Sequence, residues 1–394
     1  MDNPFQLTFT LKQHTPLIHF HDQTGATLRA TEVKPKLDKF IVEKIIEEKN
    51  HGTNLEKAFE EVKIHLVGYS PKEESKLKDR FINDGYRALN YKLRLSADLK
   101  SAIDIKIINA EKKAHIYNNI AGNFLFLQTE LKDIVKKLIV DFFSIHNFGN
   151  RQSKGYGCFT IDEINNKKID FNFKNILTKN GFFVYEKEEK NDIRFRIDRD
   201  WQILKSGFNL GGNYRKSILF DYMCNEGIRW EKRIIKQNIS VQTRLNFKLF
   251  YKHPPVNCPP SEKQYNYKYA RALLGLAENN EYLISKTDPV TGKDVVDREY
   301  KFIVRFDHLP EKENEKIERI ASPITFKVLN DKIYIIAKSI NPFVLGKDFK
   351  IELGIKHNRD QASRFGSLIE NISTPEKFEL KEFLKYAMPI LGYN

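Results

Sequence analysis

Hydrophobic and polar residues follow a regular order along the first 165 positions. Residues 5–18, FQLTFTLKQHTPLI, alternate between the two classes and therefore predict a β-strand. In 25–46 the apolar residues recur at helical spacing, which predicts a helix with Pro35 in its first turn and a buried face of Leu37, Phe40, Ile41 and Ile45. The charged stretch 52–80 has helical character.

Three further strands and a second amphipathic helix complete this half. The strands are predicted at YKLRLSA (91–97), IDIKIIN (103–109) and YGCFTIDEI (156–164). Residues 131–143, LKDIVKKLIVDFF, predict a helix whose buried face carries Leu131, Ile134, Val135, Leu138 and Phe142. The order β-α-β-β-α-β over 1–165 is typical of a ferredoxin-like domain.

The second half reads as another α+β domain, after a polar junction at 166–192. DIRFRID (192–198) and FKIELGI (349–355) predict strands, and 322–340 predicts a hairpin that turns at Asn330-Asp331. Helices are expected at 214–227, where Gly227 suits the C-terminal cap, and at 381–392. Residues 276–300 are rich in turn formers and are interpreted as an insertion. The fold class is therefore α+β, with domains 1–165 and 193–394.

Composition and charge favour an anionic partner. The 394 residues suffice for two domains, 41% of them are hydrophobic, and the formal net charge is +14. The charge is uneven, because residues 1–164 carry 25 Lys+Arg and 22 Asp+Glu, a net of +3, which leaves +11 for 165–394. Nucleic acid or an acidic membrane surface would suit this balance. The alternative is a lysine-rich surface without a functional meaning.

The location predicted from the sequence is the cytoplasm. Cys158, Cys224 and Cys258 lie far apart with no CxxC pair, which argues against a zinc module and against a disulfide framework. The N-terminus lacks the pattern of a signal peptide, and no apolar run approaches the roughly 18 residues that a membrane-spanning helix needs. We therefore expect no membrane association, no metal and no cofactor.

The clearest candidate for chemistry is the glycine-rich stretch GNRQSKGYG, residues 149–157. Glycine tolerates positive φ and lets backbone N–H groups approach a phosphate, Arg151 and Lys154 add positive charge, and Tyr156 offers a ring on which a base could stack. Its spacing matches neither a Walker loop nor a dinucleotide-binding fingerprint. The alternative is a basic turn between a helix and a strand.

Two other basic segments are candidates for phosphate contacts. Residues 194–247 hold 11 Lys+Arg against five acids, interleaved with aromatic residues and with the adjacent glycines of NLGGNY (209–214). The candidates in this segment are Tyr214, Arg215, Lys216, Arg229, Trp230, Lys232, Arg233 and Lys236. Arg29, Lys34 and Lys36 lie at the predicted start of the first helix, where an anion could bind. The alternative for 194–247 is a solvated helix face with snorkelling lysines, but the coincidence of basic residues with glycines and aromatics favours binding there. For Arg29, Lys34 and Lys36, solvation of the helix surface is an equally good explanation.

Signs of catalysis are weak. His14, His19 and His21 cluster near the N-terminus, where a histidine could serve as general acid or base in phosphodiester cleavage. No second catalytic group accompanies them, and no GxSxG, HExxH or Cys-His pairing is present. A structural role for these histidines is the simpler interpretation.

Several of these segments together resemble a known family. FGNRQSKGYGCF (148–159) resembles the glycine-rich loop of the RAMP superfamily of CRISPR RNA-binding proteins, and GATLRATEVKPKLDKF (25–40) resembles its first-helix signature. YRKSILFDYM, GIRWEKR, ALLGL and RIASPITFKV (319–328) are similar to Cmr-type subunits of type III-B systems, with the family numbered one in that series as the nearest match. Pro35, expected to interrupt the first helix, and the insertion at 276–300 depart from the family pattern.

The resemblance implies two tandem ferredoxin-like, RRM-related domains and a non-catalytic RNA-binding subunit in antiviral defence. Its partners would be guide RNA, near the 3′ end, target RNA and other RAMP-family subunits. Gly149, Gly155 and Gly157 would bring the loop close to the RNA backbone, the basic candidates would neutralise phosphates, and Tyr156, Tyr214 and Trp230 would stack or anchor. The alternatives are a guide-processing endoribonuclease that uses His14, His19 or His21, and a basic scaffold that contacts only protein.

Overall fold

The computed structural model divides the chain into two compact units. Unit 1 comprises Met1–Phe195 and Thr325–Ile336, and unit 2 comprises Arg196–Ile324 and Ala337–Asn394. The structure describes residues 3–19, 27–49, 54–106, 113–189, 192–210, 213–232, 234–235, 248–249, 266–276, 279–292, 294–310, 317, 319–357 and 363–394.

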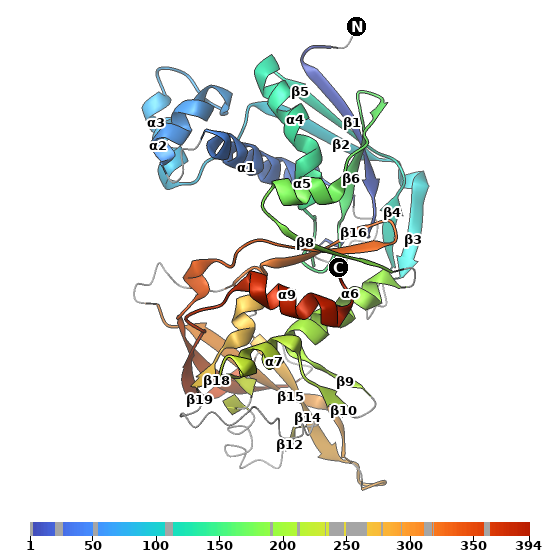
Figure 1. Ribbon diagram of the computed structural model, residues 1–394, viewed down its shortest axis with the longest axis vertical. Coiled ribbons are helices and arrows are strands. Elements are labelled where there is room, and N and C mark those ends of the chain that lie inside the picture. The colour runs from blue at the N-terminus through green and yellow to red at the C-terminus, as the bar shows by residue number, and fades with distance from the viewer. Residues whose placement is uncertain are drawn as a thin grey trace. The chain divides into compact units, whose positions relative to one another are not determined.

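A five-stranded antiparallel sheet forms the centre of unit 1. Its order is β2-β5-β1-β6-β7, with β1 at Gln6–Gln13, β2 at Tyr91–Ala97, β5 at Ile120–Phe126, β6 at Phe159–Ile164 and β7 at Lys167–Lys168. Two long helices, α1 (Ala30–Glu48) and α4 (Thr129–Ile145), lie on one side of this sheet (Figure 1). The chain order β1-α1-β2-β5-α4-β6 has the predicted alternation, but its third strand, β5, was not predicted from the sequence. The strand predicted at 103–109 corresponds to β3 (Ala102–Lys106), which lies outside this sheet.

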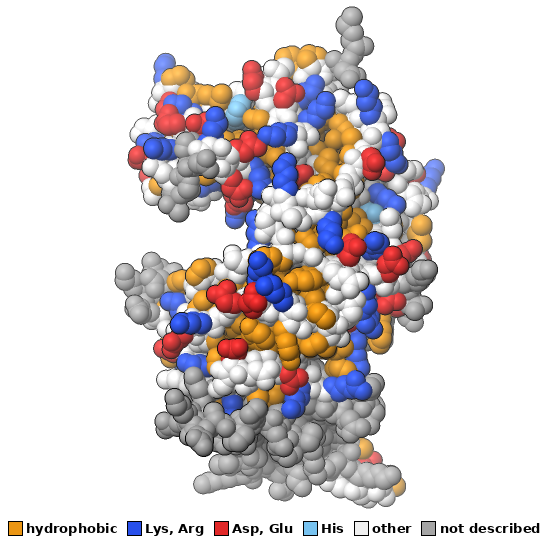
Figure 2. Space-filling view, in the orientation of Figure 1, with side chains coloured by type: hydrophobic (Ala, Val, Ile, Leu, Met, Phe, Trp, Pro, Cys, Tyr) orange, Lys and Arg blue, Asp and Glu red, His pale blue; other side chains and the backbone are white. Residues whose placement is uncertain are grey.

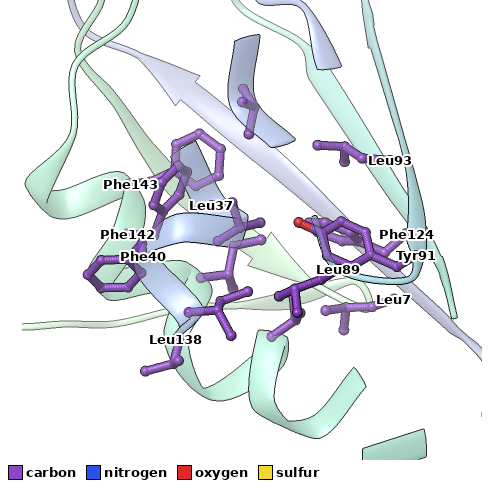
Figure 3. Close-up of a cluster of buried hydrophobic side chains, with 14 of the residues drawn as sticks. Leu7, Leu37, Phe40, Leu89, Tyr91, Leu93, Phe124, Leu138, Phe142 and Phe143 are labelled. Carbon is purple, nitrogen blue, oxygen red and sulfur yellow. The ribbon is translucent and has the colours of Figure 1, made fainter. Parts of the chain in front are cut away.

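The core of unit 1 lies between that sheet and its helices (Figure 3). Alternate residues of β1 point into it, and Phe9 packs on Phe124 of β5 with ring centroids 5.1 Å apart. On α4 the predicted buried face is confirmed apart from Ile134, which is partly buried, while Ile139 and Phe143 extend it. Full burial of each such side chain stabilises the fold by roughly 1.5–3 kcal/mol.

Pro35 does not interrupt the first helix, so that expectation is wrong. It is the sixth residue of α1, which continues to Glu48. A proline this near the N-terminus removes only the hydrogen bond to the carbonyl of Thr31, because the first four N–H groups of a helix have no intrahelical partner. The helical character of 52–80 is confirmed by α2 (Leu55–Val62) and α3 (Glu74–Asn83), and β3 (Ala102–Lys106) pairs with β4 (Lys113–Tyr117).

The division of the chain differs from the predicted one at two places. The polar tract 166–192 is part of unit 1, where it forms α5 (Phe173–Lys179) and β8 (Phe183–Glu188). The predicted hairpin exists as β16 (Ile324–Leu329) and β17 (Lys332–Ala337), with Asn330 at positive φ, but most of it also belongs to unit 1. The order β16-β17-β8 joins both segments in one three-stranded sheet, so neither is a linker.

Unit 2 contains a second antiparallel sheet, of order β12-β14-β15-β18-β19. The strands are Lys248–Leu249, Asn279–Thr287, Asp294–His308, Asp348–His357 and Ser363–Ser373. In these described residues the strand order follows the chain order, unlike the interleaved order of unit 1. The stretch 276–300 supplies β14 and the start of β15, which pair with each other, so it is part of this sheet.

Unit 2 also contains shorter elements. They include α6 (Ile193–Trp201), which begins at the end of unit 1, a π-helical turn (Gln202–Ser206), β9 (Phe208–Leu210), β10 (Asn213–Arg215), α7 (Ile218–Asn225), β11 (Ile228–Trp230), β13 (Asn266–Lys268) and α9 (Leu380–Leu391). The helices at α7 and α9 were predicted, and Gly227 follows α7 with a φ of +73°. The strand predicted at 192–198 is wrong, because α6 forms there.

The structure bears on the predictions about disulfides and membrane-spanning helices. Cys224 is disulfide-bonded, although the spacing of the cysteines argued against a disulfide framework, whereas Cys158 is free and buried. In the described ranges no helix is long and apolar enough to cross a membrane.

Candidate nucleic-acid interface

The glycine-rich loop connects the end of α4 to β6. Its two shoulders pair with each other, because Asn147 forms a β-bridge with Cys158 and the N–H of Phe148 donates to the carbonyl of Gly157 at 3.0 Å. The loop between them is therefore closed at its base and has a defined shape.

Two glycines of the loop are required by close packing. Gly149 has a φ of +73°, and a Cβ there would lie 2.5 Å from the carbonyl oxygen of Ile18. Gly157 has a φ of +65°, and its Cβ would lie 2.0 Å from the carbonyl oxygen of Phe148. Both distances are far shorter than a van der Waals contact. Packing and backbone conformation therefore require glycine at these two positions, whether or not a ligand binds.

Most backbone N–H groups of the loop are already hydrogen-bonded. The N–H of Gly149 donates to the carboxylate of Glu32. The N–H groups that donate to main-chain carbonyls are those of Phe148, Asn150, Lys154, Gly155 and Gly157. Within the described ranges, the consecutive N–H groups of Arg151, Gln152 and Ser153 have no such partner. Consecutive backbone N–H groups can bind an anion. The turn Arg151–Lys154 is thus the part of the loop able to accept a phosphate.

The two basic residues of this turn differ in exposure. Arg151 is exposed and has a φ of +56°, whereas Lys154 is half-buried and forms a β-bridge with Phe326 of β16. Arg151 is therefore the more accessible cation for an approaching phosphate.

Tyr156 does not offer a ring for stacking, because its side chain is only 2% exposed. Of the two roles predicted for it, only anchoring of the loop fits this burial.

The basic residues near the start of α1 have internal contacts. The ammonium of Lys34 lies 2.6 Å from the Asp38 carboxylate and donates to the carbonyl of Leu89 at 2.8 Å. Lys36 donates to the carbonyl of Asn147 at 3.2 Å and to Oε1 of Gln152 at 2.9 Å, and burial lowers its pKa.

These contacts favour a structural role for Lys34 and a supporting role for Lys36, which joins α1 to the loop. Arg29 is exposed as the N-cap residue of α1 and makes no side-chain capping bond. On the face drawn in Figure 2, basic and acidic side chains are interspersed over α1–α3, so the positive charge is not concentrated there.

In the second basic segment, the residues of β11 are mostly internal. Trp230 is 5% exposed and packs edge-on against Phe220 with centroids 5.1 Å apart, so it belongs to the core and cannot stack a base. Arg229 is 9% exposed. Lys232 donates to the carbonyl of Ser206 at 2.7 Å and lies over the Trp230 ring.

Arg215 is the most accessible candidate of this segment. It is exposed at the end of β10, and Lys216 beside it lies 5.5 Å from the Phe220 ring centroid. Burial, together with the positive charges of Arg215 and Arg196, lowers the pKa of Arg199, which shows that these three arginines are neighbours. Arg233, Lys236 and the side chain of Tyr214 lie outside the described residues.

The two N-terminal histidines that the structure describes, His14 and His19, are hydrogen-bonded within the protein. Nε2 of His14 lies 2.8 Å from Oγ1 of Thr160, and burial lowers the pKa of His14 to about 3. His19 bonds the carbonyl of Thr27 at 3.2 Å, and His21 lies outside the described residues. In the part of the chain that the structure describes, no group of three or more His, Cys, Asp or Glu could hold a metal ion.

Sequence reasoning missed the contribution of β16 to the loop. Asn147 donates from Nδ2 to the carbonyls of Gln152 (2.7 Å) and Phe326 (2.9 Å), so one side chain links the loop to β16. The only signal in the sequence was that RIASPITFKV belongs to the resemblance; no local pattern connects residue 147 with residue 326.

Comparisons with known proteins identify related domains across nearly the whole chain. The family model described as the Cmr1 N-terminal domain matches residues 5–208, and that of the Cmr1 C-terminal domain matches residues 214–390. No protein of curated function matches the sequence.

Two solved structures are similar to the chain. One is Cmr1 from Pyrococcus furiosus in its apo form, with 10% identity, a TM-score of 0.38 and coverage of 99% of this chain and 98% of that chain. The other is a chain from a cryo-EM structure of the type III-B Cmr-beta bound to cognate target RNA, with 11% identity, a TM-score of 0.23 and coverage of 41% of this chain and 60% of that chain.

Proposed function

The chain belongs to the Cmr1 family, and we propose that it is an RNA-binding subunit of a type III-B CRISPR effector complex. The observation that carries the RNA-binding part is the turn Arg151–Lys154, which combines an exposed arginine with three consecutive backbone N–H groups that have no partner within the described ranges. The formal charge of +14 supports the same proposal, because phosphate contacts provide most of the sequence-independent affinity for nucleic acid.

The ligand in this proposal is guide RNA, contacted near its 3′ end, together with the target strand. The neighbouring proteins are other RAMP-family subunits. We infer that unit 1 is the ferredoxin-like domain of the subunit, because its strands have the interleaved order β2-β5-β1-β6 with β1 in the centre.

The proposed role is non-catalytic. A general acid or base has to exchange a proton near the working pH, and the low pKa of His14 together with its bond to Thr160 favours a structural imidazole. The endoribonuclease alternative is tested by incubating the protein with CRISPR repeat RNA. Metal-independent cleavage that a single His→Ala substitution abolishes would establish that alternative instead.

Measuring the salt dependence of RNA binding tests the main proposal. We expect the double variant Arg151→Ala/Lys154→Ala to bind guide RNA more weakly than the wild type, and the slope of log K against log salt to fall by about 0.7 for each phosphate that the variant no longer binds. The control is Lys72→Ala/Lys76→Ala, which removes the same charge from exposed positions next to and within α3. An equal effect of both variants would mean that the turn makes no specific contact.

A further inference from the structure

Strand β16 contacts the glycine-rich loop and its shoulders at three consecutive residues. The N–H of Phe326 donates to the carbonyl of Ser153 at 3.0 Å, inside the loop. The N–H of Val328 lies 3.4 Å from Sγ of Cys158, at the shoulder that leads into β6. Lys327, between them, reaches the other shoulder. The loop of residues 149–157 is thus clamped by a segment that lies far along the chain, in the second half of the sequence.

Lys327 bonds the end of the helix that leads into the loop. Its side chain is 0% exposed, and Nζ donates to the carbonyls of Phe143 at 2.5 Å and His146 at 2.7 Å. The last four carbonyls of a helix lack intrahelical partners, and α4 ends at Ile145. An ammonium is a favourable partner for this negative end of the helix.

Burial of the charged Lys327 side chain at the end of α4 costs free energy. In the described residues no carboxylate forms an ion pair with Lys327, and its ammonium donates to the two carbonyls at the end of α4. Burying an ammonium without a counter-ion is unfavourable, but this ammonium bonds two carbonyls that an apolar side chain would leave without that partner. The bonds fix the position of His146 and thereby of Asn147, from which the loop departs.

Asn147 links the end of α4, which Lys327 fixes, to the turn Arg151–Lys154. It follows His146 directly, and its Nδ2 donates both to the carbonyl of Gln152 in the turn and to the carbonyl of Phe326 in β16. Sγ of Cys158 donates to Oδ1 of the same side chain at 3.2 Å. One buried amide thus joins the turn, β16 and both shoulders of the loop.

We propose that Lys327 and Asn147 are positioning residues for the RNA-binding turn, which they hold in its binding conformation without touching RNA. This inference rests on the proposed function of the turn Arg151–Lys154. The second half of the sequence then contributes to an RNA site whose contact residues lie in the first half.

The test is a double-mutant cycle in the full chain. Lys327→Met keeps the length of the side chain and removes the ammonium. We expect guide RNA to bind this variant about three- to tenfold more weakly at fixed salt, with a reduced salt slope, because a loosened turn binds one or two fewer phosphates. Combined with Arg151→Ala/Lys154→Ala, it should weaken binding little further, because both changes act on the same phosphates.

Arg87→Met is the matched control for Lys327→Met. Nη1 of Arg87 also donates to two main-chain carbonyls, that of Phe81 in the last turn of α3 (2.6 Å) and that of Tyr86 in the segment after it (2.8 Å), but it lies elsewhere in unit 1. We expect this variant to lower the melting temperature and to leave the affinity and salt slope for RNA unchanged. A purely structural role of Lys327 would produce the same pattern for both variants and would overturn the proposal.

Asn147→Leu tests the same inference if Lys327→Met does not fold. It keeps a side chain of similar size, adds no charge, and removes the donor that bonds Gln152 and Phe326, so it should reduce the salt slope as well. An unchanged slope in a folded Asn147→Leu variant would reject the positioning role. If Arg151→Ala/Lys154→Ala itself has no effect, the proposed function of the turn fails; if only the positioning variants have no effect, this inference alone fails.

Discussion

The imidazole of His14 is hydrogen-bonded to the hydroxyl of Thr160, with Nε2 and Oγ1 2.8 Å apart. His14 follows the end of β1, and Thr160 lies in β6, the strand that follows the glycine-rich loop. The bond therefore links two neighbouring strands of the sheet. Burial is the main reason why the pKa of His14 falls to about 3, and the positive charges of Lys12 and Lys327 lower it further.

This low pKa predicts that the protein loses stability in mild acid. In the unfolded chain His14 binds a proton near pH 6.5, whereas in the folded protein it stays neutral down to about pH 3. Its contribution is therefore complete above pH 6.5 and is lost progressively as the pH falls toward 3. From pH 7 to pH 4.5 the loss attributable to His14 is about 2 to 3 kcal/mol.

His14→Gln isolates this contribution, since it keeps a polar side chain that does not titrate. Urea unfolding at pH 7 and pH 4.5 should show a smaller difference between the two pH values for His14→Gln than for the wild type. Equal differences would mean that His14 is protonated in the folded protein at pH 4.5.

Gly157→Ala should be strongly destabilising. The new Cβ would lie 2.0 Å from the carbonyl oxygen of Phe148, at a φ of +65°. A positive φ alone costs about 1–2 kcal/mol, and the clash with the backbone adds to this. Gly181→Ala is the control, because its φ of +77° is similar but nothing lies within 4 Å of its Cβ. Thermal unfolding should show a much larger loss for Gly157→Ala than for Gly181→Ala.

The elements of unit 1 could largely be predicted from the sequence because each has a clear period. In α4 the apolar spacing fixes the buried face, and in β1 the alternation does so. The prediction failed at α6, where IRFRI alternates like a strand. The structure shows an N-terminal hydrogen bond from the N–H of Phe195 to the Asp192 carboxylate, a helix-start signal that the alternation concealed.

The site was harder to predict, because local sequence does not show which basic and aromatic side chains are exposed. Tyr156 and Trp230 both lie among basic residues, yet both are buried. Lys34 carries the positive charge that a phosphate ligand needs, but its ammonium forms an ion pair with the Asp38 carboxylate. The hairpin β16–β17 was predicted as an element, whereas its contact with the loop depends on tertiary packing that no short-range pattern encodes.

Trp230→Ala should reduce stability and leave RNA binding by the folded protein unchanged. Removing a buried aromatic side chain costs about 3–5 kcal/mol, and the indole packs on Phe220 within unit 2. Trp201→Ala serves as a control, since that tryptophan is only half-buried and its removal should cost less. Urea unfolding measures the stability, and the affinity of the folded variant for guide RNA at fixed salt measures any stacking contact. A weaker affinity of folded Trp230→Ala than of folded Trp201→Ala would assign the ring to the RNA site.

The buried ammonium of Lys327 predicts the opposite pH dependence to that of a lysine held by a carboxylate. Burial lowers the pKa of Lys327 from 10.5 to about 8. Between these two values the unfolded chain holds a proton that the folded chain has released, so stability increases as the pH rises through this window. We expect the free energy of unfolding of the wild type to gain about 1 kcal/mol from this group between pH 7 and pH 9.

Lys327→Met removes the titrating group and should abolish that gain. Other lysines and tyrosines titrate in both proteins, so the quantity to compare is the difference in unfolding free energy between wild type and variant at each pH. This difference should shift in favour of the wild type from pH 7 to pH 9. A constant difference would show that Lys327 keeps its proton in the folded protein, held by the two carbonyls that its ammonium bonds.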